Sequence, residues 1–341
     1  MTDQQFNLKK LSLSLLILIA PILLGLLALT LGRYQISAID TGRVLLSPIF
    51  PNLGTNIPDV ARQLVLRVRL PRILAALLIG ASLGITGTAF QAIFKNPLVD
   101  SNILGVTSGA GFGAALALLL LLNNWQVQIF AFLFGLLAVL ISFLGSRLYK
   151  TAPLLVLTLM GILVGSLFSS LTSLLKYVAD PLDTLPAITF WLLGSLAGVT
   201  WARIGLLAVI TLIGVIFFVL MRWQLNILSL GDKESQGLGI NVERMKLFFI
   251  IISTLMTAAA VSTSGVIGWV GLVVPHMGRL IVGPNHRYLV PVSISLGGSL
   301  MIVLDTISRT LLPGEIPLGV LTGIIGVPLL IFLLRRVRTG W

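Results

Sequence analysis

The amino-acid sequence predicts an all-α, polytopic integral membrane protein with about ten transmembrane helices, folded as a single domain over residues 1–341. Hydrophobic residues make up 57% of the 341 positions and charged residues only 10%, which is more apolar surface than a soluble core of this length needs. A bilayer core about 30 Å thick is crossed by about 20 apolar helical residues. The chain contains several apolar runs of that length, so we expect a helical, membrane-spanning protein.

Apolar runs bounded by charge, proline or asparagine predict ten spans in order along the chain. They lie near residues 11–31, 72–92, 104–122, 125–146, 153–176, 201–221, 246–263, 266–283, 289–308 and 317–335. The first run is too long for a signal peptide and no A-x-A cleavage site follows it, so we expect it to remain as the first span. The apolar piece 186–197 is too short to span and is expected to lie at the surface or to re-enter. Small residues four apart, such as Gly80 and Gly84, let helix backbones approach closely in lipid.

The basic residues predict the orientation of these spans. With both termini in the cytoplasm, fourteen basic residues face the cytoplasm and nine face outward, as the positive-inside rule favours. Six of the nine outer arginines lie between Arg33 and Arg72, which indicates an acidic partner on that side. The net charge of +12 does not indicate nucleic acid, because the basic residues are spread among short loops between spans. Membrane lipid is the expected surrounding.

The longest polar stretch inside the chain, residues 229–246, falls between the sixth and seventh predicted spans on the cytoplasmic side. Asp232 can cap a short helix there, and Gly237 and Gly239 can end it. Taken alone, this stretch is equally well interpreted as a solvated loop or as a short helix that docks a cytoplasmic protein. We refer to residues 229–246 as the coupling loop.

Several classes of function lack the residues that they need. The sequence contains no Gly-Lys dipeptide, and therefore no P-loop, so any ATP site must belong to another chain. Only Asp305, among eleven acidic residues, falls within a predicted span, which disfavours the alternative of an ion-coupled secondary transporter of a small hydrophilic solute. No nucleophile has a companion base, so we do not expect an enzyme. With no cysteine and two histidines, no transition-metal site is expected, and His276 is expected to be hydrogen-bonded at a helix break made by Pro275.

The motifs, taken together, resemble the FecCD-type permeases of ABC importers over nearly the whole chain. The matching residues include Arg69-Leu-Pro-Arg72, Asn96-Pro97-Leu98, Leu104-Gly105-Val106, residues 231–240, the run from Ser264 to His276, Arg279, Asp305, Arg309, Glu315-Ile-Pro-Leu-Gly319 and Gly326-Val-Pro328. The resemblance implies the type II importer permease fold in a bacterial plasma (inner) membrane. It implies a cargo such as a ferric siderophore, or alternatively haem or cobalamin.

The resemblance also implies partners and roles for particular residues. The expected partners are a second permease subunit, identical or paralogous, two cytoplasmic ATPase subunits that bind ATP and Mg, and an extracytoplasmic substrate-binding protein. The chain itself is expected to hold no cofactor. Docking of the binding protein is expected at Arg69, Arg72 and Arg309. Coupling to the ATPase is expected at Gly231, Asp232, Ser235, Leu238 and Gly239.

A cytoplasmic gate is expected where proline ends or starts a helix. The turns Asn96-Pro97-Leu98 and Thr151-Ala152-Pro153 both fall on the predicted cytoplasmic side, and freed backbone groups there are tolerated only where protein or water satisfies them. In the resembling family the positions matching the gate residues narrow the inner exit. These residues are Asn96, Leu98, Thr151 and Ala152.

Overall fold

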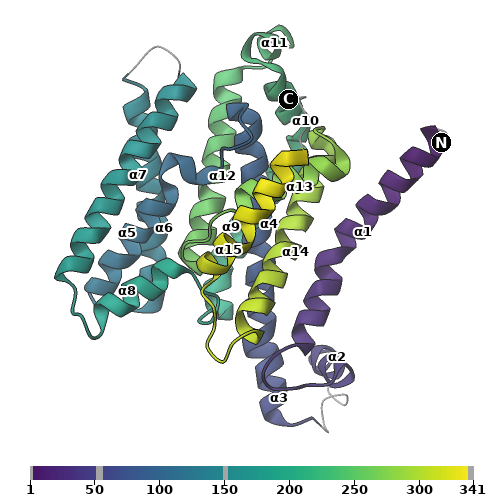
Figure 1. Ribbon diagram of the computed structural model, residues 1–341, viewed down its shortest axis with the longest axis vertical. Helices are drawn as coiled ribbons and strands as arrows, with labels where there is room; N and C mark the ends of the chain where they lie inside the picture. The colour runs from purple at the N-terminus through teal and green to yellow at the C-terminus, as the bar shows by residue number, and fades with distance from the viewer. Residues whose placement is uncertain (1–2, 51–56, 149–152, 337–341) are drawn as a thin grey trace.

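The computed structural model describes residues 3–50, 57–148 and 153–336 and is helical throughout its regular elements (Figure 1). The helices are α1 (Asp3–Thr30), α2 (Ala38–Leu46), α3 (Asp59–Gln63), the π-helix η2 (Leu64–Arg69), α4 (Leu70–Phe94), the 3₁₀-helix η3 (Ser101–Leu104), α5 (Val106–Leu119), α6 (Asn124–Ser146), α7 (Pro153–Val178), α8 (Thr184–Leu193), α9 (Trp201–Leu220), α10 (Arg222–Leu230), α11 (Asp232–Gly237), α12 (Val242–Ser264), α13 (Val270–Val282), α14 (His286–Thr310) and α15 (Leu318–Arg336). The all-α prediction is confirmed.

The predicted spans coincide with α1, α4, α5, α6, α7, α9, α12, α13, α14 and α15. Within the described residues, six helices are long and apolar enough to cross a membrane, and the remaining spans correspond to shorter apolar helices. The piece expected at 186–197 forms α8, a helix of ten residues. Pro275 does not break its helix as expected, because α13 continues past it, while His276 Nδ1 lies 2.8 Å from the Leu272 carbonyl oxygen.

The two helices α4 and α14 form the centre of the bundle and touch backbone to backbone. A Cβ atom on Gly80 would clash with the carbonyl oxygen of Gly297, and one on Gly84 would lie 2.6 Å from that of Ser293. Any side chain larger than hydrogen at Gly80 would therefore separate the helices. The close approach expected from the small-residue spacing is present here.

The longest continuous helix runs from Asp59 to Phe94 through α3, η2 and α4, and we call it the α3–α4 rod. It ends at Lys95, whose φ of 49° is left-handed and stops the helix. The backbone N–H of Leu98 then donates to Asn96 Oδ1 at 2.9 Å, which closes the turn. The expected break at Asn96-Pro97-Leu98 is therefore present.

The polar segments gather at two opposite ends of the bundle. Figure 1 shows α2 and α3 at one end, which we call the outer end, and α11 at the other, which we call the inner end. The loop between α14 and α15 also lies toward the outer end. The segment rich in arginine and the coupling loop are thus separated by the length of the bundle, as the predicted topology requires.

Candidate functional site

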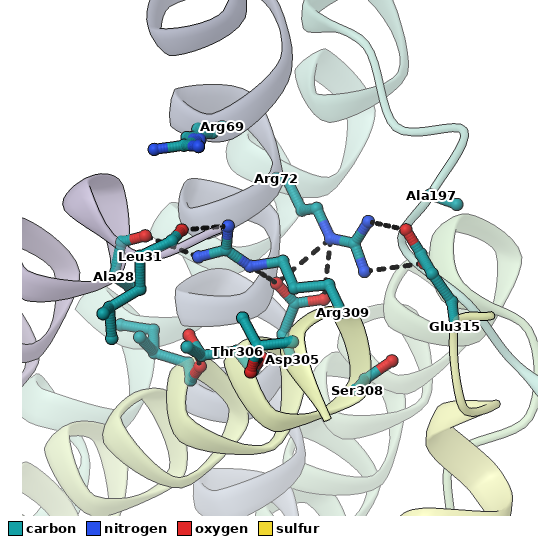
Figure 2. Close-up of polar contacts among 12 residues, drawn as sticks. Ala28, Leu31, Arg69, Arg72, Ala197, Asp305, Thr306, Ser308, Arg309 and Glu315 are labelled. Carbon is teal, nitrogen blue, oxygen red and sulfur yellow. Dashed lines mark hydrogen bonds and ion pairs between the residues drawn. The ribbon is translucent and has the colours of Figure 1, made fainter. Parts of the chain in front are cut away.

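A buried cluster of charged residues ties three elements together near the outer end. We call Arg69, Arg72, Asp305, Arg309 and Glu315 the outer arginine cluster. The Arg72 guanidinium donates to Asp305 Oδ1 at 2.8 Å through Nε, and to both carboxylate oxygens of Glu315 at 2.8 and 2.9 Å through Nη1 and Nη2 (Figure 2). One side chain of α4 thereby joins α14 to the loop that precedes α15. Bidentate pairing of this kind fixes geometry as well as charge.

The other two arginines of the cluster close the end of α1. Arg69 donates to the Leu29 carbonyl oxygen at 2.7 Å, and Arg309 donates to the Leu31 carbonyl oxygen at 2.7 Å. Figure 2 shows Arg309 reaching from α14 to the end of α1. The last carbonyls of a helix have no partner within it and carry partial negative charge, so cations are favoured there. These two contacts join α1 to η2 and α14.

The docking role expected for the three arginines would need their side chains to reach a partner, whereas the structure places all three in the interior. Arg69, Arg72 and Arg309 are 4%, 6% and 8% exposed. Their hydrogen bonds go to the chain's own carboxylates and carbonyls, because burying a guanidinium is costly unless it is paired. In this conformation the three side chains hold the outer end together, and their docking role stays a prediction.

Glu315 is the most accessible member of the cluster, with its side chain 35% exposed. Burial alone would raise the pKa of Glu315, but hydrogen bonds and charge from Arg72, with further charge from Arg33 and Arg309, lower it below the ordinary value. The carboxylate therefore remains ionised through the physiological range. The adjoining chain is also anchored, since the backbone N–H of Ile316 donates to the Ser308 carbonyl oxygen at 3.1 Å.

At the inner end, the coupling loop forms the short helix α11, packed firmly on α10. The Ser235 hydroxyl is fully buried and donates to the Ile227 carbonyl oxygen at 2.8 Å. Gly231, with a φ of 153°, occupies the position before the helix. Asp232 does not cap the helix as expected. Its carboxylate instead pairs with Lys246 of α12 at 2.7 Å.

The chain directly after α11 presents an apolar side chain to the surroundings. Leu238 follows directly after the helix and is 60% exposed. Gly239, with a φ of 79°, turns the chain back at this point. A helix held on one face by Ser235 and Asp232, with an exposed leucine beside it, forms a rigid knob at the inner end. Such an arrangement suits docking into a groove on another protein.

A second anchor of this region was not apparent from the sequence. The Asn226 side chain on α10 donates to Asn285 Oδ1 at 3.0 Å and accepts from the backbone N–H of His286 at 2.8 Å. Asn285 caps the start of α14. The coupling loop is thus linked through α10 to the helix that carries Asp305 at its opposite end. The only signal in the sequence is two asparagines about 60 positions apart, which no local pattern connects.

The structure describes half of the expected gate. Leu98 is 57% exposed and follows the turn closed by Asn96, so its side chain is available to contact another subunit. Thr151 and Ala152 lie outside the described residues.

A polar hollow of about 500 Å³ lies between α5 and α7 and was not anticipated. Its lining includes Asn102, Ser108, Ser166, Ser169 and Ser170. Serines at three- and four-residue spacing in the 153–176 span were the available signal, since that spacing places them on one face of a helix.

Comparisons with known proteins agree with this architecture. The model of the FecCD transport family matches residues 17–336. The molybdate import system permease protein MolB of Haemophilus influenzae is 37% identical over 319 residues, covering 94% of each chain. The hemin transport system permease protein HmuU of Yersinia pestis is 35% identical, covering 93% of this chain and 96% of its own. A solved structure of a metal-chelate type ABC transporter in an inward-facing conformation superposes with a TM-score of 0.86 at 36% identity, covering 96% of this chain and 99% of that one.

Proposed function

This chain belongs to the FecCD transport family and is a multi-pass permease subunit of an ABC importer, and from that premise we propose that it carries a ferric siderophore across the bacterial plasma membrane. Such a permease moves substrate without a catalytic site of its own, and family membership implies ATPase and binding-protein partners. The observation that carries the transport role is the pair of specialised ends: a bonded cluster at the outer end and a rigid, leucine-tipped knob at the inner end.

We propose that the knob is the seat of the ATPase. Leu238 supplies an exposed apolar anchor, while Ser235 and Asp232 hold α11 to α10 and α12. Movement of a nucleotide-driven partner would then be passed to α12 through Lys246 and to α14 through Asn226. In this proposal α11 and both chain termini face the cytoplasm.

We propose a dimer of this chain, or of this chain with a paralogue, in which two copies of the Asn96-Pro97-Leu98 turn narrow the inner exit. The exposed Leu98 side chain supports this arrangement. Thr151 and Ala152 belong to the same proposal on sequence grounds alone.

A second cargo is favoured by a specific observation. The MolB relative, 37% identical over 94% of each chain, is named for molybdate, so molybdate is the alternative to a ferric siderophore. The two cargoes differ in size and in the metal, which makes them separable by isotope.

Uptake into proteoliposomes tests the proposal. The permease would be reconstituted with its ATPase and binding protein, with internal ATP, and offered either iron-55 in a hydroxamate siderophore or molybdenum-99 as molybdate. We expect accumulation of the iron label that stops when ATP is replaced by a non-hydrolysable analogue. Accumulation of molybdenum alone would support the second cargo. Uptake driven by an ion gradient without ATP would contradict the importer mechanism and favour an ion-coupled carrier.

A further inference from the structure

A patch that carries only positive charge lies at the inner end, where α10 and α14 begin. We call Arg222, Trp223, Arg287 and Tyr288 the inner basic patch. Arg222 Nη1 donates to the Arg287 carbonyl oxygen at 3.4 Å, which brings the two helix starts together. The Arg287 guanidinium lies over the Tyr288 ring, 5.9 Å from the ring centroid. Among the described residues, neither guanidinium has an acidic partner, so both are available to an anion.

The sequence supplies no acidic residue to the helices that surround this patch. Residues 184–231 contain no aspartate or glutamate, and neither do residues 244–304. These ranges include α9, α10, α13 and most of α14. In the adjoining coupling loop, Asp232 is already paired with Lys246 at 2.7 Å. The positive charge of the patch is therefore not neutralised by the chain's own neighbouring helices.

The patch lies at the expected depth of the lipid headgroups. Helix α9 contains 20 residues, or about 30 Å, which equals the thickness of the hydrocarbon core, and Arg222 follows two positions after its end. Helix α14 contains 25 residues, or about 38 Å, so its first turn extends beyond that core. Trp223 and Tyr288 are 67% and 51% exposed, and these two residue types are enriched at the membrane–water interface. Figure 1 shows α10 at the inner end.

An exposed apolar stripe on α9 leads from the bilayer interior to the patch. Its side chains recur at three- and four-residue spacing, which places them on one face of the helix. They are Val209, Leu212, Ile213, Ile216 and Leu220. From the first to the last of these residues the helix rises about 16 Å, close to the depth of one leaflet. A lipid chain lying along the stripe would bring its headgroup to the inner basic patch.

We propose that the inner basic patch binds an anionic phospholipid of the cytoplasmic leaflet, an inference that rests on the proposed orientation of the permease. The phosphate lies between Arg222 and Arg287, and one acyl chain lies on the α9 stripe. Guanidinium groups match phosphate in charge and in hydrogen-bond geometry, and basic pockets between spanning helices on the cytoplasmic side recognise acidic lipids. A groove on the ATPase is a weaker match, because the apolar stripe continues from the patch into the depth of the bilayer.

Native mass spectrometry of the full-length permease with its ATPase tests this inference. The purified complex in detergent would be offered equal amounts of phosphatidylglycerol and phosphatidylcholine with identical acyl chains. One basic residue at an anionic headgroup contributes about fivefold to affinity. We expect the wild type to bind phosphatidylglycerol preferentially, and we expect R222Q/R287Q to lower that affinity about 25-fold while phosphatidylcholine binding is unchanged. If the double variant does not fold, R287Q alone, at an exposed side chain, is expected to lose about fivefold.

Arg147 provides a matched control at the same end of the bundle. Its side chain is also exposed, but its guanidinium is paired with Glu243 at 2.9 Å. We expect R147Q to change phosphatidylglycerol affinity less than about twofold, because the charge that it removes is already neutralised. An equal loss with R147Q, or equal binding of the two lipids by the wild type, would overturn the inference. Displacement of the lipid by inorganic phosphate would also overturn it, because the patch would then be a site for a free anion.

Two further measurements locate the bound lipid. Bromine atoms on the acyl chains of phosphatidylglycerol should quench a larger fraction of the tryptophan fluorescence in the wild type than in W223F. Equal quenching in the two proteins would place the lipid elsewhere and overturn the inference. Copurification of the ATPase should be unchanged by R222Q/R287Q. Loss of the ATPase with undiminished phosphatidylglycerol binding would assign the patch to the ATPase instead, without affecting the proposed importer function.

Discussion

At the scale of single residues, the Arg72–Asp305 pair is the contact on which the outer end depends. Both side chains are buried and their atoms approach to 2.8 Å. Removing one partner leaves the other charge buried without full compensation, which typically costs 3 to 5 kcal/mol, whereas exposed pairs contribute about 1 kcal/mol or less. Replacing an aspartate by asparagine should therefore lower the free energy of unfolding much more in the buried ion pair than in an exposed one.

We expect D305N to destabilise the folded protein by about 3 kcal/mol because Arg72 loses a buried anionic partner. The control is D40N, which removes the exposed Asp40–Arg43 pair and should cost less than about 1 kcal/mol. Thermal unfolding in detergent, followed by tryptophan fluorescence, should show the midpoint of D305N several degrees below that of D40N. Equal midpoints would show that the pair contributes little to stability.

Glu315 gives the outer end a predictable response to acid. Because its pKa in the folded protein is lowered, its stabilising effect is complete above the ordinary glutamate pKa of about 4.3 and is lost as pH falls through the lower folded value. A spin label on a cysteine at exposed Leu312, in the same loop, should gain mobility below about pH 4. In the E315Q background the label should be mobile at neutral pH as well. A label in E315Q that remains as immobile as in wild type would contradict this role.

Residue identities at the outer end were predictable, but their partners were not. The sequence singles out Arg72, Asp305 and Glu315, and its topology places all three toward the outer side. Their pairing joins positions 233 and 243 residues apart, and only the packing of α4 against α14 brings them together. Charge counting along the chain also cannot separate buried Arg69 from exposed Arg67, two positions away.

At the scale of elements, the apolar runs predicted the spanning helices to within about four residues, because about 20 apolar residues is a strong signal. The exception is α1, which begins at Asp3, eight residues before the predicted span. Short amphipathic helices were missed. Helix α10 lies where the sequence indicated only the end of a span, since its nine residues mix polar and apolar side chains. The π-helix η2 was also unforeseen, because no local pattern distinguishes its hydrogen bonds from those of α4.

The knob of α11 supports a prediction at this scale. We expect L238D to leave the permease folded but to detach the ATPase, because a charged side chain at an exposed anchor would have to be desolvated in the partner's groove. Copurification of the ATPase with tagged permease measures the effect, and a loss of tenfold or more is expected. The control is L312D, the same change at an exposed leucine near the outer end. Intact copurification and normal transport by L238D would show that this segment is only a loop.

At the scale of the whole molecule, the proposed dimer can be examined in a chain that contains no cysteine. A single cysteine at Leu98 should crosslink to its copy across the dimer axis with a short reagent and block uptake, if two Asn96-Pro97-Leu98 turns close the inner exit of a homodimer. A cysteine at Leu121, which is also exposed but lies at the turn between α5 and α6, should not crosslink. Absence of the Leu98 crosslink in every nucleotide state of a homodimer would place the gate elsewhere.

The α3–α4 rod carries Arg69 and Arg72 of the outer arginine cluster, and just past its inner terminus Lys95 lies 3.9 Å from Asp232 of the coupling loop. One helix therefore touches both regions where we expect soluble proteins to dock. If docking of one protein changes the affinity of the permease for the other, thermodynamic reciprocity requires docking of the second protein to change the affinity for the first by the same factor. Nucleotide exchange at the ATPase should then alter the affinity of the permease for the binding protein by the same factor by which the binding protein alters nucleotide affinity, and equilibrium titrations from the two sides should yield one shared coupling constant.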